Sequence, residues 1–418
     1  MKPPPLRDDC FALPAGVEWT PVSTAFAHLR DNLVPVAETM MVPVGAADGL
    51  YLAEAPTAQR ANPPTANSAV DGYGFAAARV PDGDVALPLV EGRAAAGVPL
   101  GTRVPAGFAV RILTGAALPD GVDTVVLEED CTVAPGRIAF RGTLKPFANT
   151  RRAGEDFDAG TVLFDKGHRL GPQDLALLAA AGLGTVRVHR PLRVAVLSTG
   201  DELCAPGAEA AAHQIYDANR PMLLALLARW GFVPVDLGCC ADDADAVRVA
   251  LDAAAADADV LITSGGASAG DEDHVSATLR TAGAMALWRI AIKPGRPLAL
   301  GLWRGMPVFG LPGNPVAAFV CALVFAAPAL RRLAGGAFQL PRGQMVPAAF
   351  AKAKKPGRRE FLRARLNADG HAEVFRSEGS GRISGLAWAD GLVELPDAAA
   401  DIRPGTPVRY IPYGAFAP

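Results

Sequence analysis

Residues 260–273 read VLITSGGASAGDED, and this stretch decides the fold class. It opens with consecutive apolar or β-branched residues, which is the composition of a strand buried on both faces. A turn rich in glycine and serine follows and leads to three adjacent carboxylates. A buried strand that ends in such a loop is typical of a parallel sheet, in which ligands bind beyond the carboxyl ends of the strands.

The same pattern occurs on both sides of this stretch. Residues 194–197 form an apolar run that ends in STGDE, and residues 308–309 form a short run that ends in GLPGNP. The segments between these runs are expected to form helices over 218–230, 244–256 and from Pro315, and a strand over 233–237. This alternation predicts an α/β domain with a doubly wound, mostly parallel sheet over residues 191–335.

The rest of the chain is expected to form three further parts. Residues 20–57 together with 161–190 are interpreted as a helical linker domain, because apolar residues recur at helical spacing in 22–33. Residues 58–160 contain short apolar runs between glycines and prolines, which predict a β-rich insert. Residues 340–418 are expected to form a small C-terminal β domain. The prediction is therefore an α/β multidomain protein.

The bulk composition excludes several classes of protein. The chain has 418 residues, 50% of them hydrophobic, and a formal net charge of −3, which argues against a nucleic-acid-binding surface. Its 6 cysteines are scattered without a CxxC pair, so neither a disulfide framework nor a zinc site is expected. Residues 1–12 lack the apolar run of a signal peptide, and no apolar stretch reaches the ~20 residues of a membrane span. These features predict a cytoplasmic protein that binds neither nucleic acid nor a membrane.

The three loops that follow the apolar runs offer backbone N–H groups to an anion. Each loop is rich in glycine or small hydroxyl residues and leads toward a helix N-terminus, where the helix dipole favours negative charge. The chain has no GxxxxGK[ST] motif and no GxGxxG motif after a strand, so neither a P-loop nor a dinucleotide-binding loop is supported. Taken singly, each loop is an ordinary turn. Together, at one edge of one sheet, they favour a phosphate-bearing ligand.

Charged side chains flank these loops. Residues 292–297, IKPGRP, hold Lys293 and Arg296 between prolines, and Arg289 precedes them. Such cations suit phosphate or a tetraoxo anion such as sulfate or molybdate, and the alternative is a solvated surface turn. The carboxylates of 271–273 would hold a divalent cation, most simply Mg²⁺, if they lie beside a phosphate. Alternatively, these carboxylates are ordinary acidic residues in the first turn of a helix, where the helix dipole favours negative charge.

In their joint order and spacing, these motifs resemble the molybdopterin molybdenumtransferases, the family of MoeA and of the E domain of gephyrin-like proteins. The segments that carry the resemblance are 67–74, 114–128, 152–156, 198–203, 215–220, 264–273, 292–297, 310–316 and 356–358. The resemblance implies a sheet of the molybdopterin-binding type and a reaction of molybdate with adenylated molybdopterin and Mg²⁺ that yields molybdenum cofactor and AMP. It also implies a homodimer in which the insert of one subunit closes the cleft of the other. Molybdopterin adenylyltransferase and molybdoenzymes are the implied protein partners.

The resemblance also assigns roles to individual residues. The family's catalytic positions fall on Asp71, Thr114, Glu202, Asp242, Asp273, Arg289, Lys293, Arg296 and Arg358. Asp273, with Asp242 or Glu202, is expected to hold the metal. Lys293, Arg296 and Arg358 are expected to bind molybdate and to neutralise charge as AMP leaves.

The pterin phosphate is expected in two of the strand-ending loops. The residues assigned to its binding are Ser264, Gly265, Gly266, Ser268, Gly270, Pro312, Gly313 and Asn314. Ala317 stands where the family usually has serine, so one hydroxyl near the expected oxyanion pocket is missing. Arg289 and Arg296 stand where lysine is common, which keeps the charge and changes the hydrogen-bond geometry.

Two other functions stay open. A molybdopterin adenylyltransferase has a similar sheet and glycine loop, but it lacks the insert and the C-terminal β domain. A non-catalytic molybdopterin-binding or scaffold protein would keep the fold without turnover. The acidic residues at Asp71, Glu202, Asp242 and Asp273 argue against the scaffold, because binding alone would not require them all.

Overall fold

The fold was analysed in a computed structural model that describes residues 19–142, 144–265, 274–282, 285–295 and 297–417, with the backbone alone for 285–289 and 297. The described chain divides into two compact units. The larger unit comprises the chain up to Met40 together with His189 onward, and the smaller unit comprises Met41–Val188. Each unit is described by itself below.

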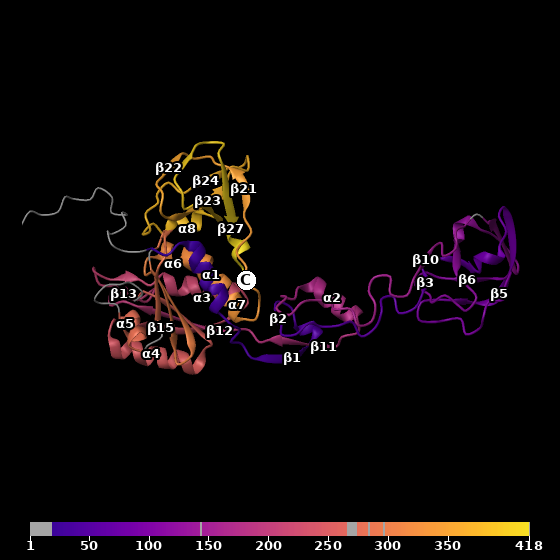
Figure 1. The fold of residues 1–418 in the computed structure, drawn as a ribbon, viewed down its shortest axis with the longest axis horizontal. Coiled ribbons are helices and arrows are strands. Elements are labelled where there is room, and N and C mark those ends of the chain that lie inside the picture. The colour runs from indigo at the N-terminus through magenta and orange to yellow at the C-terminus, as the bar shows by residue number, and fades with distance from the viewer. Residues whose placement is uncertain (1–18, 143, 266–273, 283–284, 296, 418) are drawn as a thin grey trace, which may run out of the picture. The chain divides into compact units, whose positions relative to one another are not determined.

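A six-stranded mixed sheet forms the centre of the larger unit (Figure 1). Its order is β15 (Val233–Cys240), β12 (Arg193–Thr199), β16 (Val260–Ser264), β20 (Met306–Leu311), β19 (Pro297–Trp303) and β17 (Met285–Arg289). The first four strands pair in parallel, as the alternation of apolar runs and helices predicts. The pairs β20–β19 and β19–β17 are antiparallel, and no strand was predicted over the residues of β17 and β19. Arg304 and Gly305, at φ 49° and 86°, make the tight turn that reverses the chain between β19 and β20.

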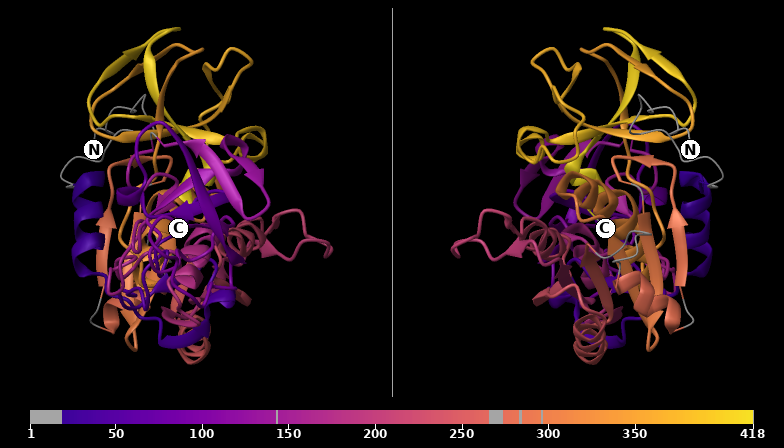
Figure 2. Two further views of the ribbon diagram at one scale, coloured as in Figure 1. Left: turned by 90° about the vertical axis from the view of Figure 1, so that its right-hand side faces the viewer. Right: turned by 90° about the vertical axis from the view of Figure 1, so that its left-hand side faces the viewer.

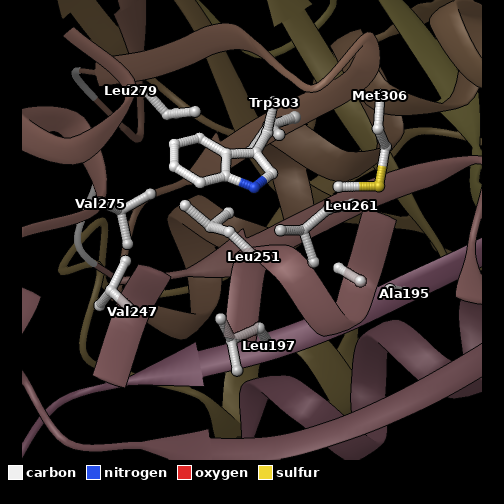
Figure 3. Close-up of a cluster of buried hydrophobic side chains, with 11 residues drawn as sticks. Ala195, Leu197, Val247, Leu251, Leu261, Val275, Leu279, Trp303 and Met306 are labelled. Carbon is white, nitrogen blue, oxygen red and sulfur yellow. The ribbon is translucent and has the colours of Figure 1, made fainter. Parts of the chain in front are cut away.

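Helices cover both faces of this sheet. Helix α3 (Asn219–Arg229) packs against α6 (Pro315–Cys321), while α4 (Ala244–Asp257) packs against α5 (His274–Thr281) on the other face. Figure 3 shows the core under α4 and α5, where the Trp303 ring lies among Leu251, Leu261 and Leu279. Trp303 donates from Nε1 to Asp252 Oδ1 at 2.8 Å, which satisfies the polar end of a largely buried ring.

A long apolar helix passes through the larger unit. It runs from Pro315 to Leu333 as α6, the π-helical turn η4 (Ala322–Ala326) and α7 (Ala327–Leu333). Its length and composition would suffice to cross a membrane, but 89% of its most apolar window is buried inside the unit, as in the core helix of a soluble protein. Helix α1 (Val22–Asn32) packs against it, and the Phe26 and Phe325 rings lie 5.3 Å apart.

The C-terminal strands form a second sheet in the larger unit, drawn in yellow and orange in Figure 2. The order is β18 (Ile292–Lys293), β23 (Arg359–Leu366), β25 (Gly391–Leu395), β27 (Pro407–Pro412) and β21 (Gln344–Pro347), and β24 (Ala372–Val374) pairs with β23. Strand β22 (Lys352–Lys354) pairs with β26 (Ala400–Ile402). Because β18 pairs in parallel with β23, Lys293 is brought opposite Glu360.

The smaller unit contains a linker and an insert. In the linker, β1 (Thr39–Pro43), β11 (Thr185–His189) and β2 (Tyr51–Leu52) form a sheet beside helix α2 (Pro172–Ala180). The segment expected to be helical over 20–57 is helical only over Val22–Asn32 and in the short turn η1 (Val44–Ala46). Helix α1 ends because Leu33 is extended and Pro35 follows closely.

The insert is rich in β structure, as expected. Its six-stranded sheet has the order β7 (Thr124–Leu127), β4 (Gly72–Phe75), β6 (Ala109–Ile112), β5 (Asp84–Ala94), β9 (Arg137–Arg141) and β8 (Thr132–Ala134). Two short strands, β3 (Asn67–Ser68) and β10 (Thr150–Arg151), pair beside it. Tyr73, Phe75, Val126 and Phe140 contribute to its core, so the insert packs around side chains of its own.

Candidate functional site

The loops after β12, β16 and β20 lie side by side. Ser198 pairs with Ser264, and Ser264 pairs with Leu311, so the three parallel strands end level with one another. Gly265 has φ +90°, and a Cβ added there would lie 2.6 Å from the Thr199 carbonyl oxygen, so only glycine fits. The predicted meeting of these loops at one edge is confirmed for Ser264, Gly265 and residues 312–314. Gly266, Ser268, Gly270 and Asp273 lie outside the described residues.

One buried amide ties two of these loops together. Asn219, at the start of α3, is 6% exposed and donates from Nδ2 to Ser264 Oγ and to the Gly313 carbonyl, both at 2.7 Å. Asn314 in turn caps α6, since its Oδ1 accepts from the Val316 N–H at 3.2 Å. Sequence reasoning did not assign a role to Asn219, although it lies in the segment 215–220 that contributed to the family resemblance.

A pocket of about 300 Å³ opens beside these loops. Its lining residues are Lys293, Pro294, Gly295, Pro312, Asn314, Ala317, Arg358, Glu378 and Ser380. The structure thus brings together Lys293, Arg358, Pro312 and Asn314, which were assigned from sequence. Ala317 is part of the wall, so a serine in its place would put a hydroxyl at this pocket.

Two carboxylates lie beside Lys293 in the pocket. Its Nζ lies 2.6 Å from Glu378 Oε2 and 3.8 Å from Glu360 Oε1. Arg296 is outside the described residues. Arg289 ends the edge strand β17, where its backbone pairs with that of Pro297.

Glu378 and Ser380 were missed by sequence reasoning. They belong to the segment RSEGSGR, residues 376–382, which follows β24. Arg363 is 4% exposed and anchors this segment, because it donates to the Arg382 and Ser377 carbonyls, each at 2.5 Å. Burial lowers the pKa of Arg363 below the usual arginine value. Residues 376–382 share glycine and serine with the loops after β12 and β16, but this composition alone does not indicate that the segment reaches the pocket.

Glu202 and Asp242 follow neighbouring parallel strands. Thr199 of β12 pairs with Cys240 of β15, so the two loops begin level with each other. The Asp242 N–H donates to Asp201 Oδ1 at 3.1 Å, which joins the loops directly. Among the described residues, no group of three or more histidine, cysteine, aspartate or glutamate side chains is arranged to hold a metal ion. The cysteines within that part of the chain are free thiols, as expected.

Asp71 and Thr114 meet within the insert. Asp71 Oδ1 accepts from both the Thr114 Oγ1 hydroxyl and the Thr114 N–H, each at 2.6 Å. These two hydrogen bonds lower the pKa of Asp71 below the usual aspartate value, and the bond from the Thr114 hydroxyl has the larger effect. Both residues are assigned to catalysis by the resemblance, and both belong to the smaller unit.

Comparisons with known proteins agree over most of the chain. Family models match in order: the MoeA N-terminal region (domains I and II) over residues 20–182, a probable molybdopterin binding domain over 195–332, and the MoeA C-terminal region (domain IV) over 345–413. The molybdopterin molybdenumtransferase of Haemophilus influenzae is 37% identical over 354 residues, 83% of this chain and 87% of that protein. Molybdopterin molybdenumtransferase 2 of Mycobacterium tuberculosis is 34% identical over 391 residues, covering 90% and 96%.

A solved structure shows the same fold. The molybdopterin biosynthesis MoeA protein of Pyrococcus horikoshii matches with a TM-score of 0.82 at 27% identity, over 95% of this chain and 100% of that one. The sequence identity of 37% with the Haemophilus protein extends over most of both chains and establishes that the two proteins are homologous. The chain belongs to the molybdopterin molybdenumtransferase family, whose MoeA domains it contains in the same order.

Proposed function

We propose that this chain inserts molybdenum from molybdate into adenylated molybdopterin, with release of AMP, in the biosynthesis of molybdenum cofactor. One observation carries the proposal: the pocket beside the strand-ending loops is lined by Lys293, Arg358 and Ser380. Two cations and a hydroxyl in one concave site suit a tetrahedral oxyanion, which offers several acceptor oxygens at once. The names of the relatives, molybdopterin molybdenumtransferases, support the transfer of molybdenum to molybdopterin.

The chain's own residues supply binding and charge neutralisation. Backbone N–H groups near Ser264, Gly265 and Asn314 would hold the pterin phosphate, with residues 266–270 of the same loop. Lys293 and Arg358 would hold molybdate and offset the negative charge that develops as the AMP phosphate leaves. None of these roles requires a covalent nucleophile, because phosphoanhydride cleavage depends mainly on positioning and electrostatic stabilisation.

Mg²⁺ is proposed to bind beside the phosphoanhydride. Glu202 and Asp242 follow adjacent parallel strands, and carboxylate and phosphate oxygens are the ligands that Mg²⁺ prefers. With Asp273, which lies outside the described residues, they would hold the ion, and it would polarise the bridging phosphate when bound. The substrate phosphates would complete the shell of the ion.

The test is anaerobic turnover of adenylated molybdopterin with molybdate and Mg²⁺, followed by AMP release. Wild type is expected to release AMP only when molybdate is present. Lys293→Gln should lower kcat/KM by about a hundredfold, since it removes a cation from the reacting charge. Lys355→Gln, an exposed lysine of the same domain, serves as the matched control and should keep the wild-type rate.

The other outcomes separate the remaining functions. Tight binding of adenylated molybdopterin without AMP release, under conditions where a known family member turns over, would indicate a scaffold. Consumption of ATP with molybdopterin would indicate an adenylyltransferase. Either result would overturn the proposed reaction.

The assembly is proposed to be a homodimer in the cytoplasm. The insert of one subunit would bring Asp71 and Thr114 to the pocket of its partner subunit. Molybdopterin adenylyltransferase would supply the adenylated substrate, and molybdoenzymes would accept the product. These assignments follow the family relationship.

A further inference from the structure

Four charged side chains from separate segments form a cluster, and two of them, Lys293 and Glu378, line the pocket. Lys293 comes from β18, Lys352 from β22, Glu360 from β23, and Glu378 from the segment after β24. Glu378 contacts both lysines, with Lys293 Nζ at 2.6 Å. Glu360 also lies between them, 3.1 Å from Lys352 Nζ and 3.8 Å from Lys293 Nζ. Each lysine is therefore shared by the same two carboxylates.

The members of this cluster differ in how far they are open to water. The side chains of Lys293, Lys352 and Glu360 are 17%, 14% and 10% exposed, whereas that of Glu378 is 42% exposed. Three members are thus held in place by packing and by strand pairing. Glu378 is the most exposed of the four side chains and has the shortest path into water.

Glu378 also lies between two pockets. Lys293, Pro294 and Glu378 line both the pocket of about 300 Å³ and a second pocket of about 210 Å³. The second pocket reaches Arg363 and Arg376. Movement of the Glu378 side chain would therefore open the space between two cation-lined pockets.

The two lysines and two carboxylates of the cluster carry no net charge together, while Arg358 lines the same pocket and Lys354 interacts electrostatically with Glu360 and Lys352. Departure of Glu378 would therefore make a site with further cations more positive. A carboxylate that bridges two ammonium groups presents its oxygens as two oxygens of a tetrahedral oxyanion would. Burial opposes the ionised form of Glu378, but hydrogen bonds from Lys293 and Lys352 outweigh it and lower the pKa of that carboxyl.

We propose that Glu378 is a resident anion of the oxyanion subsite, displaced when molybdate enters, and that Lys352 then binds the oxyanion together with Lys293. The charge of Glu378 thereby sets the affinity of the subsite, and weak competing oxyanions are rejected because each must displace a bound carboxylate. The identity of the oxyanion as molybdate rests on the proposed function. The inference that Glu378 competes with an oxyanion for the two lysines rests on the ion pairs of the cluster.

Calorimetric titration of the full chain with molybdate alone, and with sulfate alone, tests this competition. Glu378→Gln should tighten binding of both oxyanions by roughly tenfold, because the competing charge is removed while the side-chain size is kept. Glu378→Asp keeps the charge but shortens the side chain by one methylene, so any tightening should be smaller than that of Glu378→Gln. Glu373→Gln, on β24 in the same domain, is the control and should also match wild type. In the Glu378→Gln background, Lys352→Gln should lose the gain.

Each result decides the matter. Unchanged or weaker oxyanion binding by Glu378→Gln, with a wild-type melting temperature, would overturn the proposal. A gain that persists after Lys352→Gln would overturn the role of Lys352. If Glu378→Gln unfolds, Glu378→Ala takes its place, and unchanged or weaker oxyanion binding by that variant would equally overturn the proposal. Because the titrations need no turnover, their failure is distinct from a failure of AMP release.

Discussion

Gly295 lies in the wall of the pocket in a conformation that other residues rarely adopt. Its φ is +103°, and a Cβ at this position would lie 3.1 Å from the buried Cys321 Sγ. Gly295→Ala is expected to lower the free energy of unfolding by about 1–3 kcal/mol, through backbone strain and crowding. It should also weaken molybdate binding, since Lys293 belongs to the same short segment. Chemical denaturation and oxyanion titration measure the two effects.

Gly305→Ala is the matched control for this change. Gly305 has φ +86°, but nothing lies within 4 Å of the position of its added Cβ. Gly305→Ala therefore introduces backbone strain without a close contact between the new Cβ and another side chain. Equal losses of stability in the two variants would show that the contact with Cys321 contributes nothing.

The hydrogen bonds from Thr114 make the pKa of Asp71 sensitive to a single substitution. Thr114→Val removes the hydroxyl that donates to Oδ1 and keeps the side-chain shape, so the pKa of Asp71 should rise toward its ordinary value of 3.8. A depressed carboxyl pKa stabilises the fold at pH above the unfolded value, and this contribution is lost as the pH falls through the folded value. Carboxyl carbon NMR titration should show the rise. Thr132→Val, in the same insert, should leave the titration of Asp71 unchanged.

At the scale of elements, Asn219 joins α3 to the ends of β16 and β20. Asn219→Asp turns a buried donor into an acceptor that faces Ser264 Oγ and the Gly313 carbonyl. We expect a loss of about 2–3 kcal/mol in the free energy of unfolding, because buried acceptors lose their partner and a charge is buried beside them. Chemical denaturation measures the loss. Asn32→Asp is the control, since Asn32 donates to the His28 carbonyl on an exposed surface.

Comparing the two variants shows whether the Asn219 hydrogen bonds fix the loops after β16 and β20. A loss for Asn219→Asp no larger than that for Asn32→Asp would mean that backbone register alone fixes the loops. A larger loss accompanied by a raised KM for the pterin substrate would show that α3 positions the phosphate loops.

Strands that are buried on both faces could be predicted from sequence, because each is a continuous run of apolar or β-branched residues. The run at 194–197 corresponds to β12, and residues 260–263 correspond to β16. The antiparallel strands β17 and β19 were not predicted. The direction of β19 relative to β20 depends on the tight turn at Arg304 and Gly305, which the apolar content of the strands does not encode. The same holds for the linker, where short strands pair across a long sequence separation.

The candidate site was predictable where its loops follow buried strands. Ser264, Asn314 and Lys293 were assigned and do lie at one edge or pocket. Glu378 and Ser380 were not, because they reach the pocket only through the pairing of β18 with β23 and the anchoring of their segment by Arg363. Such contacts between distant segments leave no periodic pattern in a sequence.

At the scale of the whole molecule, the residues assigned to catalysis belong to two compact units. Asp71 and Thr114 are in the smaller unit, while Lys293 and Arg358 are in the larger one. A dimer whose composite sites combine the insert of one subunit with the pocket of the other would account for this division. The proposal has a direct genetic consequence, because two different inactive subunits would then complement each other.

Mixing Asp71→Asn and Lys293→Gln subunits tests that consequence. In a mixed dimer, one composite site carries both changes and the other carries neither, so random exchange should restore about a quarter of the wild-type AMP release. Each variant alone should stay inactive. Activity that fails to rise on mixing, although native mass spectrometry of differently tagged subunits shows exchange, would place Asp71 and Lys293 of one active site in the same subunit. Partial recovery at the expected level would instead require both subunits at every site, since only then does each variant supply what the other lacks.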